Sequence, residues 1–160
     1  MKVRPTILLD TGVLYAFVDN DDERNLDSKA IMLQILRGIF GSPIIIDYVV
    51  VETFLLLKAR KLSSRIGVLE EFLQLNRFKI VFVSEDIYNN AMKFAIDKKN
   101  QDFLSLTDSS EIVVSRELDC HSIATFDRVL RNFFEVGVGK GYFDQLDQKE
   151  KQAMLKRYRK

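Results

Sequence analysis

Four acidic residues stand at positions where the core of a globular protein would not normally place a carboxylate. Asp10 and Asp127 each follow a short apolar run, and Asp108 lies in the polar stretch Leu-Thr-Asp-Ser-Ser. Glu52 lies inside a segment that is apolar on nearly every side, where an unpaired carboxylate is costly to bury. Carboxylate oxygens are the ligands that Mg²⁺ and Mn²⁺ prefer, so these residue types point to metal chemistry if the fold brings them together.

The elements that must position these acids alternate between short apolar runs and longer amphipathic ones. Strands are expected over residues 6–9, 43–46, 79–83, 122–124 and 133–136, with a glycine-rich turn over 137–141. Helices are expected over residues 12–18, 29–40, 48–61, 63–75, 84–98, 108–118 and 148–158. This alternation predicts βαβ units and an α/β fold with a parallel sheet. Because the carboxyl ends of parallel strands meet along one edge, Asp10 and Asp127 are expected to converge there, with Asp108 at an adjacent helix start.

Each acid also has a purely structural explanation. Asp10, Asp108 and Asp127 lie near expected helix starts, where aspartate is a common cap, and Asp108 with Glu111 has the spacing of a capping box. Glu52 lies in mid-helix and cannot be a cap, so a buried ion pair with Lys or Arg is its best structural alternative. Taken together, however, converging carboxylates repel one another and raise each other's pKa values unless a cation neutralises them.

Composition sets the broad class of the protein. A chain of 160 residues with 47% hydrophobic residues predicts one globular domain with a sizeable core. No apolar run approaches the roughly 20 residues of a membrane span, so no membrane association is expected. The single cysteine, Cys120, rules out an internal disulfide framework and is typical of a reducing, cytoplasmic setting.

The two ends of the chain differ in charge. Residues 149–160 contain six basic residues and one acidic residue, a net charge of +5, which leaves −4 on the remainder of a chain whose total is +1. Such a basic tail either contacts a polyanion or is a solvated terminus. We therefore expect a folded domain over residues 1–141 and a basic, helical extension over residues 142–160.

Other chemistry that these residue types suggest is disfavoured. The chain has one His and one Cys, so no zinc ligand set exists. Cys120 and His121 are adjacent at the start of an expected strand, where neighbouring side chains point to opposite sides and are poorly placed to act as nucleophile and base. A phosphatase with Asp10 as its nucleophile would usually have a second Asp two positions later, where this chain has Gly12.

Four short motifs in order resemble those of the PIN domain, a nuclease fold that includes the VapC-type toxins of toxin–antitoxin pairs and rRNA-processing nucleases. They are Leu-Leu-Asp-Thr-Gly-Val-Leu, Val-Val-Glu, Leu-Thr-Asp-Ser-Ser and Ala-Thr-Phe-Asp, and the resemblance spans residues 7–136. It implies a three-layer α/β/α fold with a central parallel sheet.

The resemblance also implies a site and an activity. Asp10 and Asp108 would bind Mg²⁺ or Mn²⁺, Glu52 and Asp127 would complete the catalytic set, and the hydroxyls of Thr11 and Thr125 would position these groups. The implied protein is a metal-dependent endoribonuclease, either the toxin of a toxin–antitoxin pair or an rRNA-processing factor. Its implied partners are RNA, a cognate antitoxin and a second copy in a homodimer. The alternative is a catalytically inactive PIN-like binding or scaffold protein, in which the acids act only as caps and ion pairs.

Overall fold

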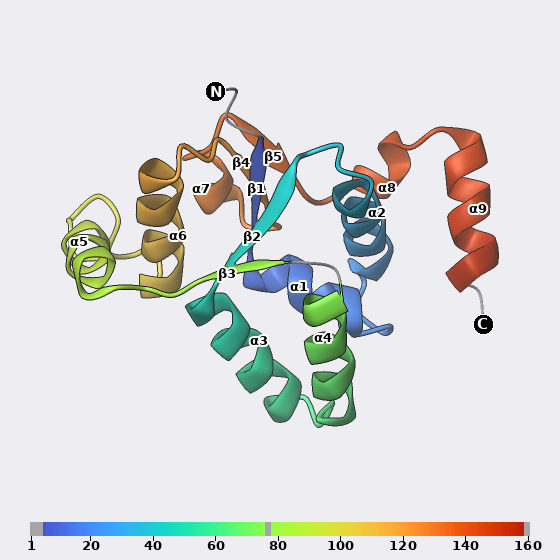
Figure 1. Cartoon of the computed structure of the whole chain (residues 1–160), viewed down its shortest axis with the longest axis horizontal. Coiled ribbons are helices and arrows are strands. Elements are labelled where there is room, and N and C mark those ends of the chain that lie inside the picture. Colours follow the sequence, from blue (N-terminus) through green and yellow to red (C-terminus); the bar gives the residue numbers. More distant parts are fainter. Residues whose placement is uncertain (1–4, 76–77, 159–160) are drawn as a thin grey trace.

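The protein is built around a five-stranded, all-parallel sheet with the strand order β3-β2-β1-β4-β5 (Figure 1). The computed structural model describes residues 5–75 and 78–158. The strands are β1 (Thr6–Leu9), β2 (Ser42–Ile46), β3 (Lys79–Val81), β4 (Ser122–Ala124) and β5 (Val136–Val138). Residues 1–4 of the predicted domain and the last two residues of the predicted basic extension lie outside the described ranges.

Helices flank the sheet on both sides. They are α1 (Thr11–Val18), α2 (Asn25–Leu36), α3 (Asp47–Ala59), α4 (Ser64–Leu75), α5 (Glu85–Ala95), α6 (Leu106–Glu117), α7 (Arg128–Arg131), α8 (Tyr142–Gln145) and α9 (Gln148–Tyr158). In Figure 1, α2 lies to one side of the strands, and α5 and α6 lie to the other. The predicted α/β fold with a central parallel sheet is confirmed. In the described ranges, we find no helix with the length and apolar character needed to cross a membrane.

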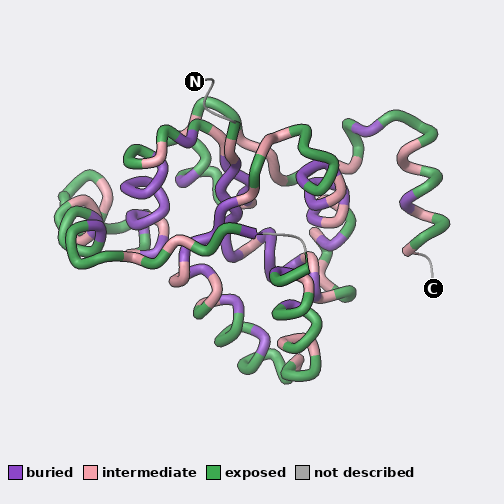
Figure 2. Tube along the Cα trace, viewed as in Figure 1, coloured by how far each residue is buried: buried purple, intermediate pink, exposed green. Residues whose placement is uncertain are grey.

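Burial follows the sheet. Figure 2 shows the central strands and the facing sides of α1, α2 and α6 in the buried colour, whereas α5 and α9 are mostly exposed. The apolar runs Ile7–Leu9 and Ile44–Ile46 are buried throughout, as expected for strands covered by helices on both faces. The core therefore holds the strand ends in fixed positions, and these ends carry the acids of interest.

The order in which successive strands are added to the sheet reverses between β1 and β4. The chain passes from β1 to β2 and β3 on one side, and then crosses back to β4 and β5 on the other side of β1. In open α/β sheets such a switch point leaves a crevice beyond the carboxyl ends of the strands. The backbone N–H of Asp10 donates to the carbonyl of Ala124 at 3.0 Å, so the residues that follow both strands meet at this crevice.

The predicted fifth strand over residues 133–136, followed by a turn, is wrong in its position. The strand begins at Val136, and Gly137 pairs with Ile123 of β4. Glycine is required at residue 139, because a Cβ there would lie 2.1 Å from the backbone oxygen of Thr125, whereas a Cβ on Gly137 would meet only the flexible side chain of Arg131. The glycines that favoured a turn in the sequence instead allow close approach of the strand.

Candidate active site

Asp10 lies at the end of β1, in the position that precedes α1. Its side chain makes no capping hydrogen bond to that helix, so the structural explanation of Asp10 as a cap does not hold. Instead, its Oδ2 accepts a 2.6 Å hydrogen bond from the hydroxyl of Thr125, which follows β4. The side chain is buried, with 8% exposure. Asp10 is therefore a buried carboxylate oriented by a residue 115 positions away in the sequence.

Asp108 lies in the first turn of α6, where it takes part in a reciprocal cap. Ser105 is the N-cap residue: its hydroxyl accepts from the N–H of Asp108 at 3.1 Å, and its own N–H donates to Asp108 Oδ2 at 2.7 Å. The capping box predicted for Asp108 and Glu111 is therefore wrong, because the box is formed three residues earlier. This arrangement fixes one carboxylate oxygen of Asp108 and frees Glu111 for another role.

Glu111 is the site residue that the sequence interpretation missed. It lies one turn after Asp108 on α6 and is fully buried. Neither of its carboxylate oxygens has a hydrogen-bond partner among the described residues. One carboxylate oxygen each from Asp10, Asp108 and Glu111 lies within 4.8 Å of the other two. The sequence signal for Glu111 was its spacing of three residues from Asp108, which places the two acids on one face of the helix.

Glu52 projects from α3 and is held by two threonine hydroxyls. Thr11, the first residue of α1, donates to Oε2 at 2.9 Å, and Thr107 of α6 donates to Oε1 at 2.6 Å. Among the described residues Glu52 has no ion pair with Lys or Arg, so the expected structural alternative is absent there. Both hydroxyls donate to the carboxylate, which orients it across three helices. Thr107 was not predicted, because only the fold brings it to Glu52.

Asp127 lies at the edge of this group and acts as a helix cap. Its Oδ1 accepts from the backbone N–H groups of Val129 and Leu130 at 2.6 and 3.1 Å, at the start of α7. The hydroxyl of Thr125 accepts from the N–H of Asp127 at 3.0 Å while it donates to Asp10. The cap interpretation of Asp127 is thus confirmed. Its charge nevertheless reaches the pocket, since it helps to raise the pKa of Asp108.

The pocket disfavours negative charge in the absence of a cation. Burial raises the pKa of Asp10 to about 6, with smaller contributions from the charges of Asp108 and Glu52 and an opposing hydrogen bond from Thr125. Burial also raises the pKa of Glu111 well above its usual range, and the charges of Asp10 and Asp108 act in the same direction. The pKa of Asp108 is raised chiefly by burial as well. A cation would relieve all of these costs together.

The donor set fits a hard divalent cation. Three carboxylates supply oxygen ligands, and those of Glu111 are buried without partners, which is otherwise a costly arrangement. Oxygen-only sets with room for water suit Mg²⁺ and Mn²⁺ rather than zinc. Asp10, Asp108 and Glu111 are therefore the residues that could hold such an ion.

Comparison with known proteins places the chain in a family. Residues 7–135 match the model of the PIN domain. The chain belongs to the PIN-domain family. The VapC ribonuclease of Archaeoglobus fulgidus is 27% identical over 147 residues, which cover 92% of this chain and 91% of that protein. This PIN-domain protein is homologous to the VapC ribonuclease toxins.

Solved structures agree on the fold. Mycobacterium tuberculosis VapC20, described as a toxin that cleaves the sarcin–ricin loop, superposes with a TM-score of 0.67 at 17% identity, covering 79% of this chain and 93% of that one. PAE2754 from Pyrobaculum aerophilum superposes with a TM-score of 0.55 at 16% identity, covering 96% and 89%. At these identities the similarity establishes the fold of this PIN-domain protein.

The raised pKa of Asp10 predicts an unusual pH dependence of stability. A carboxyl whose pKa rises from 3.8 to about 6 on folding binds its proton more tightly in the folded state. Its contribution is complete below pH 4 and is lost as pH rises through 6, a change of roughly 3 kcal/mol by the usual conversion of 1.36 kcal/mol per pH unit. In EDTA, the unfolding free energy of wild type should fall, relative to that of Asp10→Asn, between pH 4 and pH 7. The unfolding free energies are measured by urea denaturation. A difference between the two proteins that stays constant from pH 4 to pH 7 would contradict this prediction.

Proposed function

We propose that this PIN-domain protein is a cytoplasmic, metal-dependent endoribonuclease that hydrolyses RNA phosphodiester bonds. The observation that carries the proposal is the buried, unpartnered carboxylate of Glu111 beside those of Asp10 and Asp108. A set of three close acids lowers stability unless it holds a cation, so a purely structural function explains it poorly. Homology to VapC ribonucleases supports RNA as the substrate and the toxin of a toxin–antitoxin pair as the biological setting.

In this proposal the residues of the pocket divide the work. Asp10, Asp108 and Glu111 hold Mg²⁺ or Mn²⁺, which when bound supplies Lewis-acid polarisation of the scissile phosphate and an activated water. Thr125 orients Asp10 through its 2.6 Å hydrogen bond. Thr11 and Thr107 hold Glu52 so that it can orient the attacking water, and Asp127 adds negative charge at the rim. Attack by water on the phosphorus breaks the P–O3′ bond, so one product carries a 5′-phosphate and the other a 3′-hydroxyl.

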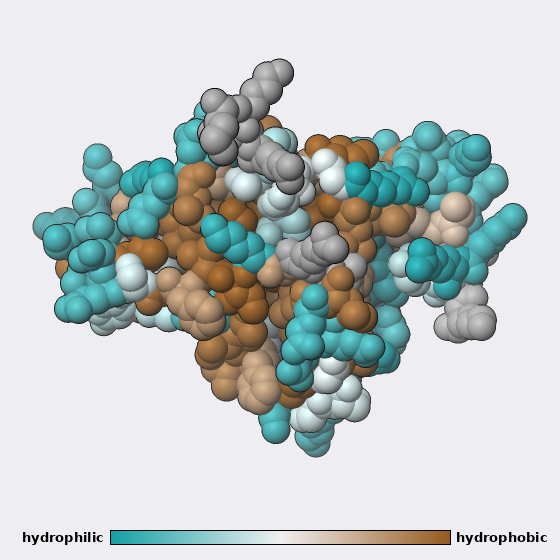
Figure 3. Space-filling view, viewed as in Figure 1, coloured by the Kyte–Doolittle hydropathy of each residue, from teal (hydrophilic) through white to brown (hydrophobic). Residues whose placement is uncertain are grey.

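Partners are proposed on the apolar surface next to the pocket. Figure 3 shows a hydrophobic area over α3 and the neighbouring β3, and its exposed side chains include Val51, Leu55, Leu56, Ile80 and Phe82. A groove of about 370 Å³ between α3 and α4 is lined mainly by apolar side chains. Such surfaces in a soluble protein mark sites of association, here a cognate antitoxin or a second copy. Light scattering tests the homodimer, and co-purification with the product of an adjacent reading frame tests the antitoxin.

Metal removal tests the proposed activity directly. Purified full-length protein should cleave a mixed-sequence RNA in Mn²⁺, and EDTA should reduce the rate by at least about 100-fold because the pocket then repels the phosphate backbone. Adding Mn²⁺ in excess should restore cleavage, and the products should carry a 5′-phosphate, which a phosphate-dependent exonuclease can detect. Cleavage that continues unchanged in EDTA would exclude the proposed mechanism.

Calorimetry with Mn²⁺ alone separates the enzyme from the scaffold alternative. Binding should raise the melting temperature, because a ligand that binds only the folded state stabilises it by mass action. Absence of binding at millimolar Mn²⁺ in a folded sample would favour an inactive binding module and overturn the proposal.

A further inference from the structure

Helix α9 lies beyond the end of the PIN-domain match, as do β5 and α8. The match ends at residue 135, whereas α9 spans Gln148–Tyr158. Figure 1 shows α9 on the far side of α2 from the sheet, away from the strands and from α6. Its function is therefore not explained by the site described above, although it contains four of the basic residues of the chain's positive tail.

One face of α9 is anchored to α2. Met154 is buried in a small apolar cluster with Leu146 and Ala30. Glu150 accepts a 2.7 Å hydrogen bond from the guanidinium of Arg37, so its charge is neutralised within the protein. Asp27 of α2 further holds the preceding segment, because its two oxygens accept the backbone N–H groups of Gly141 and Phe143 at 2.8 Å each. The helix thus presents a defined outer surface.

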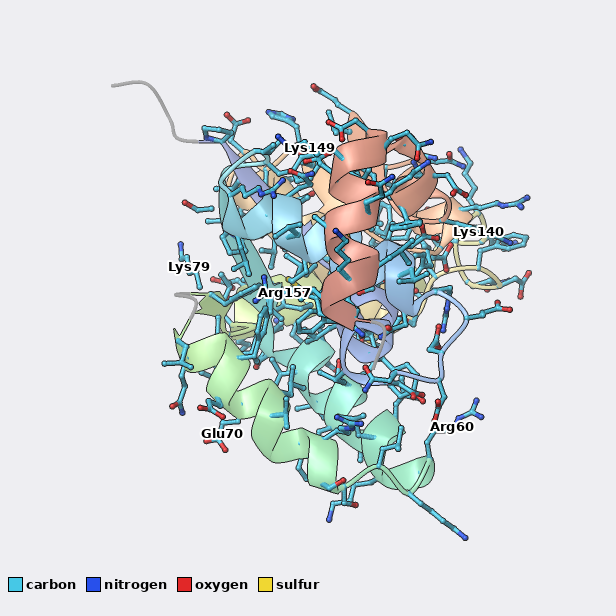
Figure 4. The ribbon with its side chains drawn as sticks, turned by 90° about the vertical axis from the view of Figure 1, so that its right-hand side faces the viewer. Arg60, Glu70, Lys79, Lys140, Lys149 and Arg157 are labelled. Atoms are coloured by element: carbon cyan, nitrogen blue, oxygen red, sulfur yellow. The ribbon has the colours of Figure 1, made fainter. Side chains whose placement is uncertain are left out.

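The outer face of α9 is basic. Lys149, Gln152, Ala153 and Lys156 are exposed at spacings of three and four residues, which place them on one face of the helix. Lys149 and Lys156 are two turns apart, about 10 Å along the axis. Arg157 is also exposed, and Figure 4 shows it near the opposite end of α9 from Lys149.

These three cations are not neutralised by the protein. Among residues 5–75 and 78–158, none of Lys149, Lys156 and Arg157 forms an ion pair with a carboxylate. Arg157 lies over the ring of Tyr158, 5.8 Å from its centroid, a contact that supplies no carboxylate. Lys151 differs, because its ammonium also donates to the carbonyl of Asp144 at 2.7 Å. The three free cations therefore remain available to an anionic partner.

The neighbouring surface adds positive charge and limits where an anion can lie. Lys29 of α2 lies 4.6 Å from the ring centroid of Tyr158 in α9, and burial together with repulsion from Arg65 lowers its pKa. Between the last turn of α9 and residues 20–26, a cavity of about 700 Å³ has Asp21 and Glu23 in its wall, so the cavity itself disfavours phosphate. Arg157 also lines this cavity and so lies at the edge of the outer face, whereas Lys149 and Lys156 are not among the lining residues and are free of this opposition.

We propose that the outer face of α9 binds the phosphate backbone of RNA through Lys149 and Lys156, with Arg157 at the edge of this face, as a contact surface outside the acidic pocket. The proposal rests on the ribonuclease function for the identity of the polyanion. Lysine and arginine contacts to phosphates release counterions, so binding must weaken as salt rises, by about 0.7 logarithmic units per contact for a single strand. Because the surface is remote from the reacting atoms, it contributes to RNA affinity rather than to the chemical step.

The test compares two variants that lose the same charge. The first is Lys149→Gln/Lys156→Gln/Arg157→Gln, and the matched control is Lys93→Gln/Lys98→Gln/Lys99→Gln, whose residues are exposed on and after α5. Both are placed in full-length Asp108→Asn protein with EDTA, and a fluorescein-labelled 20-nucleotide single-stranded RNA is titrated by anisotropy. The α9 variant should lose about 10- to 100-fold in affinity at 0.1 M salt and reduce the salt slope by about 2, whereas the control should change little. Melting temperatures verify that both variants fold.

Each outcome decides between the proposals. An equal loss of RNA affinity in both variants would overturn the α9 proposal, because net charge alone would then explain the binding. No loss of affinity in the α9 variant would also overturn it, because α9 would then make no contact with RNA. With the catalytic residues intact, the α9 variant should raise KM and leave kcat unchanged. If wild type binds RNA through α9 but cuts none, the ribonuclease proposal fails while the surface stands. If wild type cuts RNA and the α9 variant binds RNA as the control does, the α9 proposal fails while the ribonuclease proposal stands.

Discussion

Asp108→Asn is expected to reduce RNA cleavage by at least about 1,000-fold, which corresponds to roughly 4 kcal/mol of lost transition-state stabilisation. The substitution removes one of three carboxylates whose oxygens lie within 4.8 Å of one another, and with it the charge that would hold the cation. Asparagine can still accept the N–H of Ser105, so the cap of α6 and the fold should survive. The measurement is the initial rate of cleavage in saturating Mn²⁺, with the melting temperature as a check on folding.

A matched control is available in the first turn of another helix. Asp86 lies in the first turn of α5 and is exposed, outside the acidic pocket. Asp86→Asn removes the same charge and should leave the cleavage rate within a factor of two. Asp108→Asn protein that cuts RNA as fast as wild type would show that the catalytic assignment is wrong.

Glu111→Gln is expected to change stability and metal binding in opposite directions. The carboxyl of Glu111 is fully buried and has no hydrogen-bond partner among the described residues, so its ionised form is costly in the metal-free protein. A neutral side chain of the same shape should stabilise the metal-free protein at pH 8 by about 1–3 kcal/mol. The same change should weaken Mn²⁺ binding by at least about tenfold and lower the cleavage rate, as in other sites where function is retained at a cost in stability.

Urea denaturation in EDTA and calorimetry with Mn²⁺ provide the two readouts. Glu117→Gln serves as the control, because Glu117 is exposed at the end of the same helix and should alter neither quantity. A variant that loses stability in EDTA, or that binds Mn²⁺ as tightly as wild type, would mean that Glu111 has a structural function and is not a ligand.

Local sequence patterns predicted much of the fold. The strands over residues 6–9 and 122–124 and the helix over 148–158 have the predicted bounds, because the apolar runs and helical periodicity that define them are short-range features. The first turn of α6 was misjudged by two residues. Ser105 and Asp108 are three residues apart, and so are Asp108 and Glu111, so either pair had the spacing of a capping box. The structure forms the box between Ser105 and Asp108 and buries Glu111.

Asp10, Asp108 and Glu52 could be recognised from the sequence because each is an acid in an improbable local setting. Their partners do not stand out locally: Thr11 and Thr125 were predicted as positioning residues only through the resemblance to the PIN domain, and Thr107 was not predicted. The hydroxyl of Thr107 meets Glu52 across 55 residues, and that of Thr125 meets Asp10 across 115. Threonines at helix starts and strand ends are common, and nothing in their local sequence distinguishes a hydroxyl that orients a carboxylate.

The sequence by itself determined the alternation of strands and helices, and thereby the edge of the sheet at which Asp10 and Thr125 meet, since parallel strands end on the same side. Only the tertiary structure decided which acids converge. It buried Glu111 beside Asp10 and Asp108, and it placed Asp127 at the rim as a cap. The physical reason is that helical periodicity and strand alternation are local properties of the chain, whereas burial and the distance between carboxylates depend on packing among β1, α3, α6 and β4.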